Sequence, residues 1–201
     1  MAVGVAERGA VERACRGGTE TVFSFGNSLD STQANFDGNY PYGNGKKGPY
    51  LEKTAAVKSY AANGYGLYDM HGNVYEWCAD WYGETLPGGV DPQGAKTGSF
   101  RVFRGGSWVS HGEACRSAFR TGSLRSTGST TVGFRLAAVP QRRWEQSRRE
   151  EEGGTPGTQG GDGGTAERLE NFLKLSEFPD NTDGLRVFQS AMHPEPGPPT
   201  C

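Results

Sequence analysis

Two carboxylates, Asp69 and Glu76, lie on either side of a glycine-asparagine turn in the most aromatic part of the chain, residues 63–82. The turn at Gly72-Asn73 could direct both side chains and the intervening backbone carbonyls toward one centre. Carboxylate and carbonyl oxygens are the hard ligands that Ca²⁺ prefers. The spacing therefore indicates a calcium site. The alternative is that Asp69 caps the turn and Glu76 forms an ion pair with a buried arginine.

The stretch that carries these carboxylates, NGYGLYDMHGNVYEWCADWY, interleaves aromatic and large aliphatic residues with Gly, Asn, Asp and Glu. It is too rich in turn formers for a helix and too apolar for a solvated loop. We expect buried irregular backbone over residues 63–82. Such backbone has no hydrogen-bond ladder of its own, so side chains or a bound cation must satisfy its N–H and C=O groups.

Four motifs follow one another along the chain: GLYDM at 66–70, GNVYEW at 72–77, RGGSW at 104–108 and GFR at 133–135. In order and spacing they resemble the motifs of the formylglycine-generating enzyme family, also called sulfatase-modifying factors. The resemblance extends over about residues 13–138. It implies an α+β fold: an irregular, loop-rich, C-type-lectin-like domain with short strands. The family includes oxidases, partners of iron sulfoxide synthases and non-catalytic binding proteins, so membership fixes the fold better than the activity.

The resemblance also implies particular metal ligands. In the family a Ca²⁺ is held by the side chains at the positions of Asp69 and Glu76 and by the carbonyls at the positions of Gly72 and Val74. We therefore expect a calcium ion at these four residues.

A second Ca²⁺ lies in the family near an asparagine that matches Asn35. The Phe36 carbonyl and Asp37 are further candidates for this site. The later aspartate ligand of the family has no clear match here, because Pro49 or its neighbours fall at that position. The second site is thus the less complete of the two.

Catalytic members of the family carry two cysteines after the RGGS motif, and their thiolates bind a copper ion that activates oxygen. The matching positions here are Ser110 and Cys115. A hydroxyl is a poor replacement for a thiolate toward Cu(I), and His111 with Cys115 does not make an evident site. We expect a non-catalytic domain without copper. The alternative is an oxidase that converts a sulfatase cysteine to formylglycine, with Cys115 as its remaining catalytic cysteine.

A third interpretation concerns the loop over residues 109–132, where the segment 121–131 is small and polar. Some relatives are variable binding proteins that are diversified in this region, and the residue types here fit that substitution set. They also fit ordinary drift, or a degenerate gene remnant. The candidates for a ligand-display loop are Ser110, His111, Arg125 and Thr127.

Several elements must position these residues. A short helix is predicted over residues 7–16, ended by Gly17-Gly18. Strands are predicted at 22–25, 101–104, 117–120 and 133–137, the last three forming a small sheet. Arginines on these strands are expected to pair with acidic groups such as Glu76. A structured loop is expected over 29–50, anchored by Phe36, Tyr40, Tyr42 and Tyr50, and a surface loop over 83–99. We expect Trp77, Trp81 and Tyr82 in the core; the alternative is a platform on which a sugar stacks.

Three segments divide the chain by composition. Residues 1–139 form the predicted domain, which we expect to be truncated at its N-terminus. Residues 140–164 form a charged segment and a Gly-rich linker, and residues 165–201 a short helix and a disordered tail. The four cysteines form no C-x-x-C pair, so we expect free or buried thiols; the alternative is a disulfide between Cys78 and Cys115.

The net charge of −2 gives no global field that would attract nucleic acid or an anionic membrane. No apolar run is long enough to span a bilayer, and the first ten residues contain charges before any signal-peptide core could form. We expect a cytoplasmic protein whose partner is an unknown protein or small-molecule ligand, with a sulfatase as one candidate. The leading interpretation is a Ca²⁺-stabilised, non-catalytic binding domain.

Overall fold

The computed structural model describes residues 2–86, 88, 94–124, 129–139 and 186–190. The predicted linker (140–164) and the predicted helix near residues 165–178 lie outside these ranges. The elements, in chain order, are β1 (Ala2–Val5), α1 (Arg8–Arg16), β2 (Tyr75–Trp81), β3 (Phe100–Arg104), the 3-10 helix η1 (Gly112–Cys115), β4 (Thr121–Leu124), β5 (Val132–Val139) and β6 (Arg186–Ser190).

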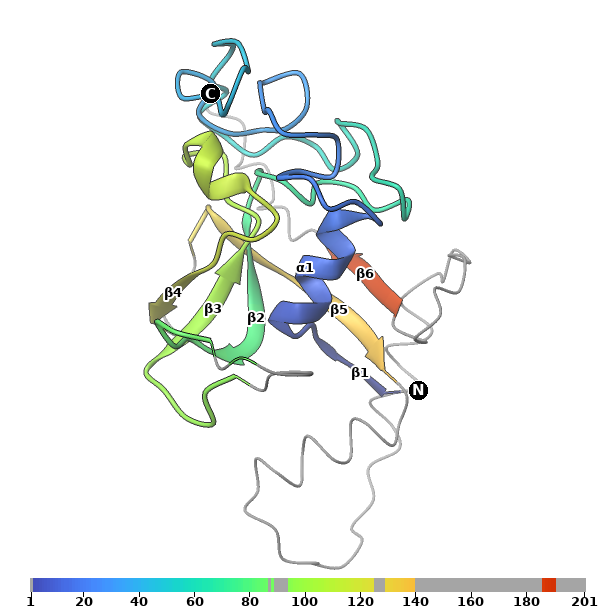
Figure 1. The fold of residues 1–201 in the computed structure, drawn as a ribbon, viewed down its shortest axis with the longest axis vertical. Coiled ribbons are helices and arrows are strands. Elements are labelled where there is room, and N and C mark those ends of the chain that lie inside the picture. Colours follow the sequence, from blue (N-terminus) through green and yellow to red (C-terminus); the bar gives the residue numbers. More distant parts are fainter. Residues whose placement is uncertain (1, 87, 89–93, 125–128, 140–185, 191–201) are drawn as a thin grey trace, which may run out of the picture.

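One mixed sheet organises the described part of the chain: β4, β3, β2 and β5 are successive neighbours, and both β1 and β6 also pair with β5. β5 runs parallel to β2 but antiparallel to β1 and β6, and the β2-β3 and β3-β4 pairs are antiparallel. Figure 1 shows the sheet in the lower half of the view, α1 packed across it, and the loops that follow α1 gathered above. The described part of the chain thus combines a mixed sheet and one helix with long loops, which agrees with the expected α+β fold.

The helix α1 confirms the predicted helix at 7–16. Val11, Ala14 and Cys15 are buried on one face and pack in a core cluster with Cys78 and Val102 of the sheet. It ends at Gly17, which adopts the left-handed conformation with φ 58° and donates its N–H to the Arg13 carbonyl. Glycine is favoured at such a helix terminus because it has no Cβ to clash.

The expectation of irregular backbone throughout residues 63–82 is wrong for its second half. Residues 75–81 form β2, which pairs with β3 on one side and β5 on the other. The alternation of aromatic side chains with Glu76 and Cys78, both buried, is a strand period that the neighbouring glycines obscured. Trp77, Trp81 and Tyr82 are only partly buried, not fully enclosed in the core.

Two other predicted strands are also wrong. Residues 22–25 form a tight turn closed by reciprocal hydrogen bonds between Phe23 and Gly26. Residues 117–120 are a turn that follows η1, and the strand begins at Thr121 instead. In both places short alternating sequences were too local to show whether a partner strand lies beside them.

The long loop 29–50 is structured, as expected, and its apolar residues form a second core cluster with η1. Phe23, Leu29, Phe36 and Cys115 are fully or almost fully buried in this cluster. Tyr40, predicted as an anchor, is instead 52% exposed. The loop therefore packs through Leu29 and Phe36.

Cys15, Cys78 and Cys115 are all buried free thiols, which agrees with the expectation and not with the alternative, a Cys78–Cys115 disulfide. Among the described residues, no helix combines the length and the apolar character needed to cross a lipid bilayer.

Candidate functional site

The Gly72-Asn73 turn lies at the centre of the candidate site and is held from two sides. The N–H of Gly72 donates to the Gly105 carbonyl at 2.7 Å, and that of Asn73 donates to the Asn35 carbonyl at 2.7 Å. Gly72 has φ 75°, and a Cβ there would lie 2.2 Å from the Asn35 oxygen. Glycine is therefore required at this position, both for the turn and for the close approach of the 35–36 backbone.

The Asn73 side chain supplies hydrogen bonds that irregular backbone cannot make for itself. Its Oδ1 accepts from the Ala55 N–H at 2.8 Å and from Asn35 Nδ2 at 3.1 Å. The Asn73 carbonyl accepts from the Trp108 N–H at 2.9 Å. A buried side chain thus joins three loops, as the hydrogen-bond requirement of buried coil predicted. Asn73 was not among the predicted site residues, although its place in a Gly-Asn turn was a signal.

Glu76 forms an ion pair with Arg135 of β5, and the two side chains are only 6% and 3% exposed. Arg135 Nη2 also donates to the carbonyls of Tyr68 at 2.8 Å and Asp69 at 3.0 Å. Burial raises the pKa of Glu76, and the nearby Asp69 adds to the rise, whereas Arg135 opposes it. This confirms the prediction that a strand arginine pairs with Glu76.

A cation at this position is compatible with part of the geometry. Glu76 Oε2 is buried and has no hydrogen-bond partner among the described residues. Asp69 Oδ2 accepts the Lys58 N–H at 2.9 Å, and Asp69 is held in the left-handed conformation with φ 53°. No group of three or more His, Cys, Asp or Glu side chains in the described ranges could hold a metal ion. An ion here would therefore depend on the backbone carbonyls of Gly72 and Val74 as well as on the two carboxylates.

The second predicted calcium site is brought together only in part. Asn35 Oδ1 is buried without a hydrogen-bond partner in the described structure, while Nδ2 donates to the Lys53 carbonyl at 2.9 Å. Asp37 lies beyond Phe36 and caps its own turn, because its Oδ1 accepts from the N–H and Nδ2 of Asn39. Asn35 is thus available to a cation, but Asp37 is engaged elsewhere.

The two positions that match the family's copper ligands do not fit a Cu(I) ion. Ser110 Oγ accepts from the Ser107 N–H at 3.0 Å and donates to the Tyr75 hydroxyl oxygen at 3.1 Å. Cys115 is fully buried, and burial raises the pKa of its thiol to about 12. A Cβ on Gly106, which has φ 76°, would lie 2.6 Å from Cys115 Sγ. Ser110 is a hydrogen-bonded hydroxyl and Cys115 a packed neutral thiol.

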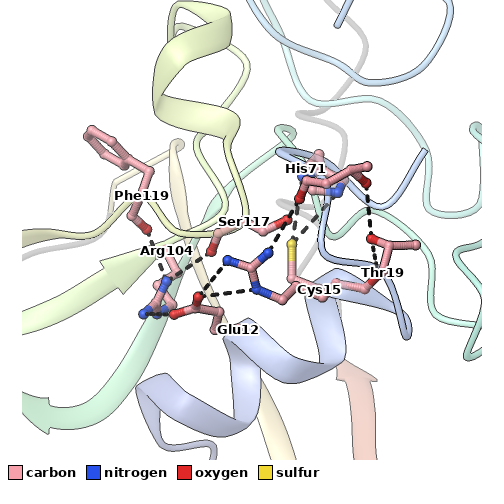
Figure 2. Close-up of polar contacts among 9 residues, drawn as sticks. Glu12, Cys15, Thr19, His71, Arg104, Ser117 and Phe119 are labelled. Atoms are coloured by element: carbon pink, nitrogen blue, oxygen red, sulfur yellow. Dashed lines mark hydrogen bonds and ion pairs between the residues drawn. The ribbon is translucent and has the colours of Figure 1, made fainter. Parts of the chain in front are cut away.

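Beneath these positions lies a buried histidine that the sequence analysis did not assign. His71 Nδ1 donates to the Cys115 carbonyl at 2.8 Å, and Nε2 accepts the Ser24 N–H at 3.1 Å. Cys15 Sγ lies 3.6 and 3.7 Å from the two ring nitrogens (Figure 2). Burial lowers the pKa of His71 to about 4 and raises that of Cys15 to about 12. The histidine is therefore a neutral connector between α1, the 23–26 turn and η1.

Figure 2 also shows the polar contacts next to this histidine. Arg104 of β3 is almost fully buried and donates through Nη2 to Glu12 at 2.7 Å. Its Nη1 donates to the carbonyls of Ser117 and Phe119 at 3.0 and 3.2 Å. Arg104 thereby connects α1 to the turn after η1, a structural role like that of Arg135.

Two aromatic stacks, partly or largely exposed, involve the residues on either side of Val109-Ser110 in the sequence. Tyr40 stacks on His111 with ring centroids 4.0 Å apart, and Tyr50 stacks on Trp108 at 6.2 Å. Val109, between these stacks in the sequence, is 42% exposed. We call these five residues the aromatic face. Of the predicted display residues, His111 belongs to it, Ser110 is buried beneath it, and Arg125 and Thr127 lie outside the described residues.

Comparisons with known proteins agree with this geometry. The Thermomonospora curvata formylglycine-generating enzyme is 37% identical over 143 residues, which are 64% of this chain and 47% of that protein. The Chlamydia caviae serine/threonine-protein kinase pkn1 is 40% identical over 128 residues, 61% of this chain and 19% of the kinase. The solved structure of Treponema denticola variable protein 1 is 32% identical with a TM-score of 0.57, over 67% of this chain and 46% of that one. The chain thus spans less than half the length of each.

The profile of the FGE-sulfatase family, described as the sulfatase-modifying factor enzyme 1-like domain, matches residues 8–139. This range contains the Gly-Asn turn, the Glu76–Arg135 pair and the Ser110 and Cys115 positions. The chain therefore belongs to the formylglycine-generating enzyme, or sulfatase-modifying factor, family.

Proposed function

We propose that this chain is a non-catalytic, Ca²⁺-stabilised binding domain of the formylglycine-generating enzyme family. The observation that carries the proposal is the state of the two copper-ligand positions. Ser110 offers a hydroxyl already bonded to Ser107 and Tyr75, and Cys115 is fully buried. A soft metal ion prefers thiolate ligands, and the two positions supply one cysteine instead of two. The same fold can serve binding without the redox chemistry.

The proposed binding surface is the aromatic face formed by Tyr40, Tyr50, Trp108, Val109 and His111. Stacked, partly exposed rings present large apolar area at low conformational cost, which suits a ligand-contact surface. The partner would be a protein or a small molecule, with a sulfatase among the candidates. Calcium would stabilise the Gly-Asn turn through Asp69 and Glu76, next to Trp108 of this surface, whose N–H donates to the Asn73 carbonyl.

A related candidate function is that of a diversified, lectin-like ligand-binding protein. The similarity to Treponema denticola variable protein 1 favours it. Its display residues would extend the aromatic face through His111 toward Arg125 and Thr127.

The proposal predicts no formylglycine formation. When the chain is loaded with copper and incubated with oxygen, reductant and a cysteine-containing sulfatase peptide, mass spectrometry should show unchanged peptide. The Thermomonospora curvata enzyme, treated alike, serves as the positive control. Conversion above the level of a copper-only blank would overturn the non-catalytic assignment and support the oxidase alternative.

Calcium is expected to raise the melting temperature of the chain. Binding to the folded state alone stabilises it by about 2.7 kcal/mol when the free ion is at roughly 100 times its Kd. Glu76→Gln should abolish the response, because the amide keeps an acceptor for Arg135 but removes the charge that Ca²⁺ requires. Glu113→Gln, at a largely exposed side chain, is the matched control and should respond like the wild type. A wild-type melting temperature that is the same in calcium and in chelator would rule out the ion.

A further inference from the structure

The two long edges of β5 are covered by different parts of the chain. Along one edge, β2 pairs with Val132 to Phe134, and β1 continues the edge by pairing with Leu136 to Val139. Along the other edge the described structure places only β6, antiparallel over Phe134 to Ala138. The outer edge of β5 therefore depends on a single strand of five residues.

Without β6, this edge would have none of the features that protect exposed strands. The strand sequence VGFRLAAV contains no proline and a single charge, Arg135, whose guanidinium is turned to Glu76 in the interior. β4, at the opposite border of the sheet, has only four residues, includes Gly122 and follows Arg120. Long, weakly charged edges pair readily with other strands, whereas short edges next to charges do not. The outer edge of β5 is thus the strand-accepting border of the sheet.

The strand that covers this edge comes from far along the chain, because residues 140–185 separate β5 from β6. The entropic cost of closing such a connection grows only slowly with its length. A strand on the same chain has an effective concentration that depends on the length and stiffness of the connection. We therefore expect it to occupy the edge in the isolated chain, yet to yield to a competing strand of higher affinity or concentration.

We propose that the outer edge of β5 is a strand-addition site whose resident occupant is this chain's own segment Arg186–Ser190. The segment binds within the same molecule, antiparallel, in the register that places Leu136 opposite Phe188 and Ala138 opposite Arg186. Strand addition of this kind gains affinity from backbone hydrogen bonds and tolerates a range of sequences. The inference rests on sheet topology and is independent of the proposed binding function.

A disulfide trap tests the register in the full-length chain. Leu136→Cys with Phe188→Cys, in a Cys201→Ser background, should form an intrachain disulfide under mild oxidation, detected by mass spectrometry and as a monomer by size-exclusion chromatography. The matched control pairs Leu136→Cys with Gln189→Cys; a shift of one residue places the two Cβ atoms on opposite faces. Equal yields in the two variants, or a trapped pair that joins two chains, would overturn the proposal.

Displacement is tested with a labelled peptide that copies residues 184–192. In the variant Val187→Pro/Phe188→Pro, two adjacent residues lose their backbone N–H groups. Because successive N–H groups of a strand point to opposite sides, one of the two must face β5, so the variant should no longer pair with the outer edge of β5. The peptide should bind this variant about tenfold or more tighter than the wild type, since the tethered strand no longer competes. Gln159→Pro/Gly160→Pro is the control and should match the wild type. Equal affinity for wild type and variant would contradict a displaceable resident strand; the disulfide trap decides the case if the variant does not fold.

Discussion

Replacement of Arg135 by methionine should lower the free energy of unfolding by about 3–5 kcal/mol at neutral pH, the range expected when one partner of a buried ion pair is removed. Methionine keeps much of the apolar volume of arginine but offers no donor. The Glu76 carboxylate would stay buried without its counter-charge, and the carbonyls of Tyr68 and Asp69 would lose the Nη2 donor. Urea or guanidinium unfolding of both proteins, compared at equal m-values, measures the loss.

The loss of unfolding free energy in Arg135→Met should become smaller as the pH falls. Burial raises the pKa of Glu76 and Arg135 opposes the rise, so loss of the arginine raises that pKa further. A carboxyl whose pKa is higher in the folded than in the unfolded state loses stability as pH rises through the folded pKa. Below the pKa of unfolded glutamate this penalty is absent.

Two further variants identify the cause of the loss. Glu76→Gln combined with Arg135→Met should recover part of the stability, because no charge remains buried. Arg13→Met, at an exposed position of α1, removes an arginine away from this pair and should cost much less. A pH-independent loss, equal in the single and double variants, would show that Arg135 acts only through packing.

The same pair shows what could be predicted from sequence. The four motifs and the glycine that ends α1 are local signals, and both the family and the helix followed from them. The partner of Glu76 was predicted as a strand arginine because an acid in apolar surroundings needs a nearby cation. Which arginine it is depends on the parallel pairing of β2 with β5, and that is a tertiary contact.

The strands that were missed or wrongly predicted have a common physical cause: strand formation here depends on contacts between distant parts of the chain. β1 and β6 both pair with β5, from opposite ends of the sequence, and neither segment carries a strong local strand signal. Residues 117–120 alternate like a strand but lie in a turn, where the carbonyls of Ser117 and Phe119 accept from the Arg104 side chain instead of from a neighbouring strand. Strand propensity depends on what lies beside the segment, which a short pattern does not reveal.

Some site residues could be predicted from a local motif, whereas the role of others depends on contacts between distant segments. Ser110 and Cys115 were found from their spacing after the RGGSW motif. The structure adds that the Ser110 hydroxyl is hydrogen-bonded and that the Cys115 side chain is fully buried. His71 was overlooked, since a single histidine in a Gly-rich stretch has no pattern around it. Its role appears only when α1, the 23–26 turn and η1 come together around the ring.

Acid should destabilise the chain through His71. Burial lowers the pKa of His71 in the folded state to about 4, below the 6.5 of an exposed histidine. A depressed pKa means that its contribution is complete above pH 6.5 and is lost as the pH falls toward about 4, below which it no longer changes. A shift of this size corresponds to roughly 3 kcal/mol. Chemical unfolding measured across this interval should show the corresponding decline in the wild type.

The matched comparison is His71→Gln against His111→Gln. Glutamine can donate to the Cys115 carbonyl and accept from the Ser24 N–H but cannot gain a proton in this interval, so His71→Gln should be less stable at high pH yet nearly flat between pH 6.5 and about 4. His111 is exposed and stacked on Tyr40, so its replacement should leave the slope unchanged. If the free energy of unfolding of His71→Gln still declines between pH 6.5 and about 4, carboxylates and not His71 cause the acid sensitivity, and the prediction is wrong. If the decline disappears, one neutral ring connects α1 to η1, and its protonation loosens the support beneath the aromatic face.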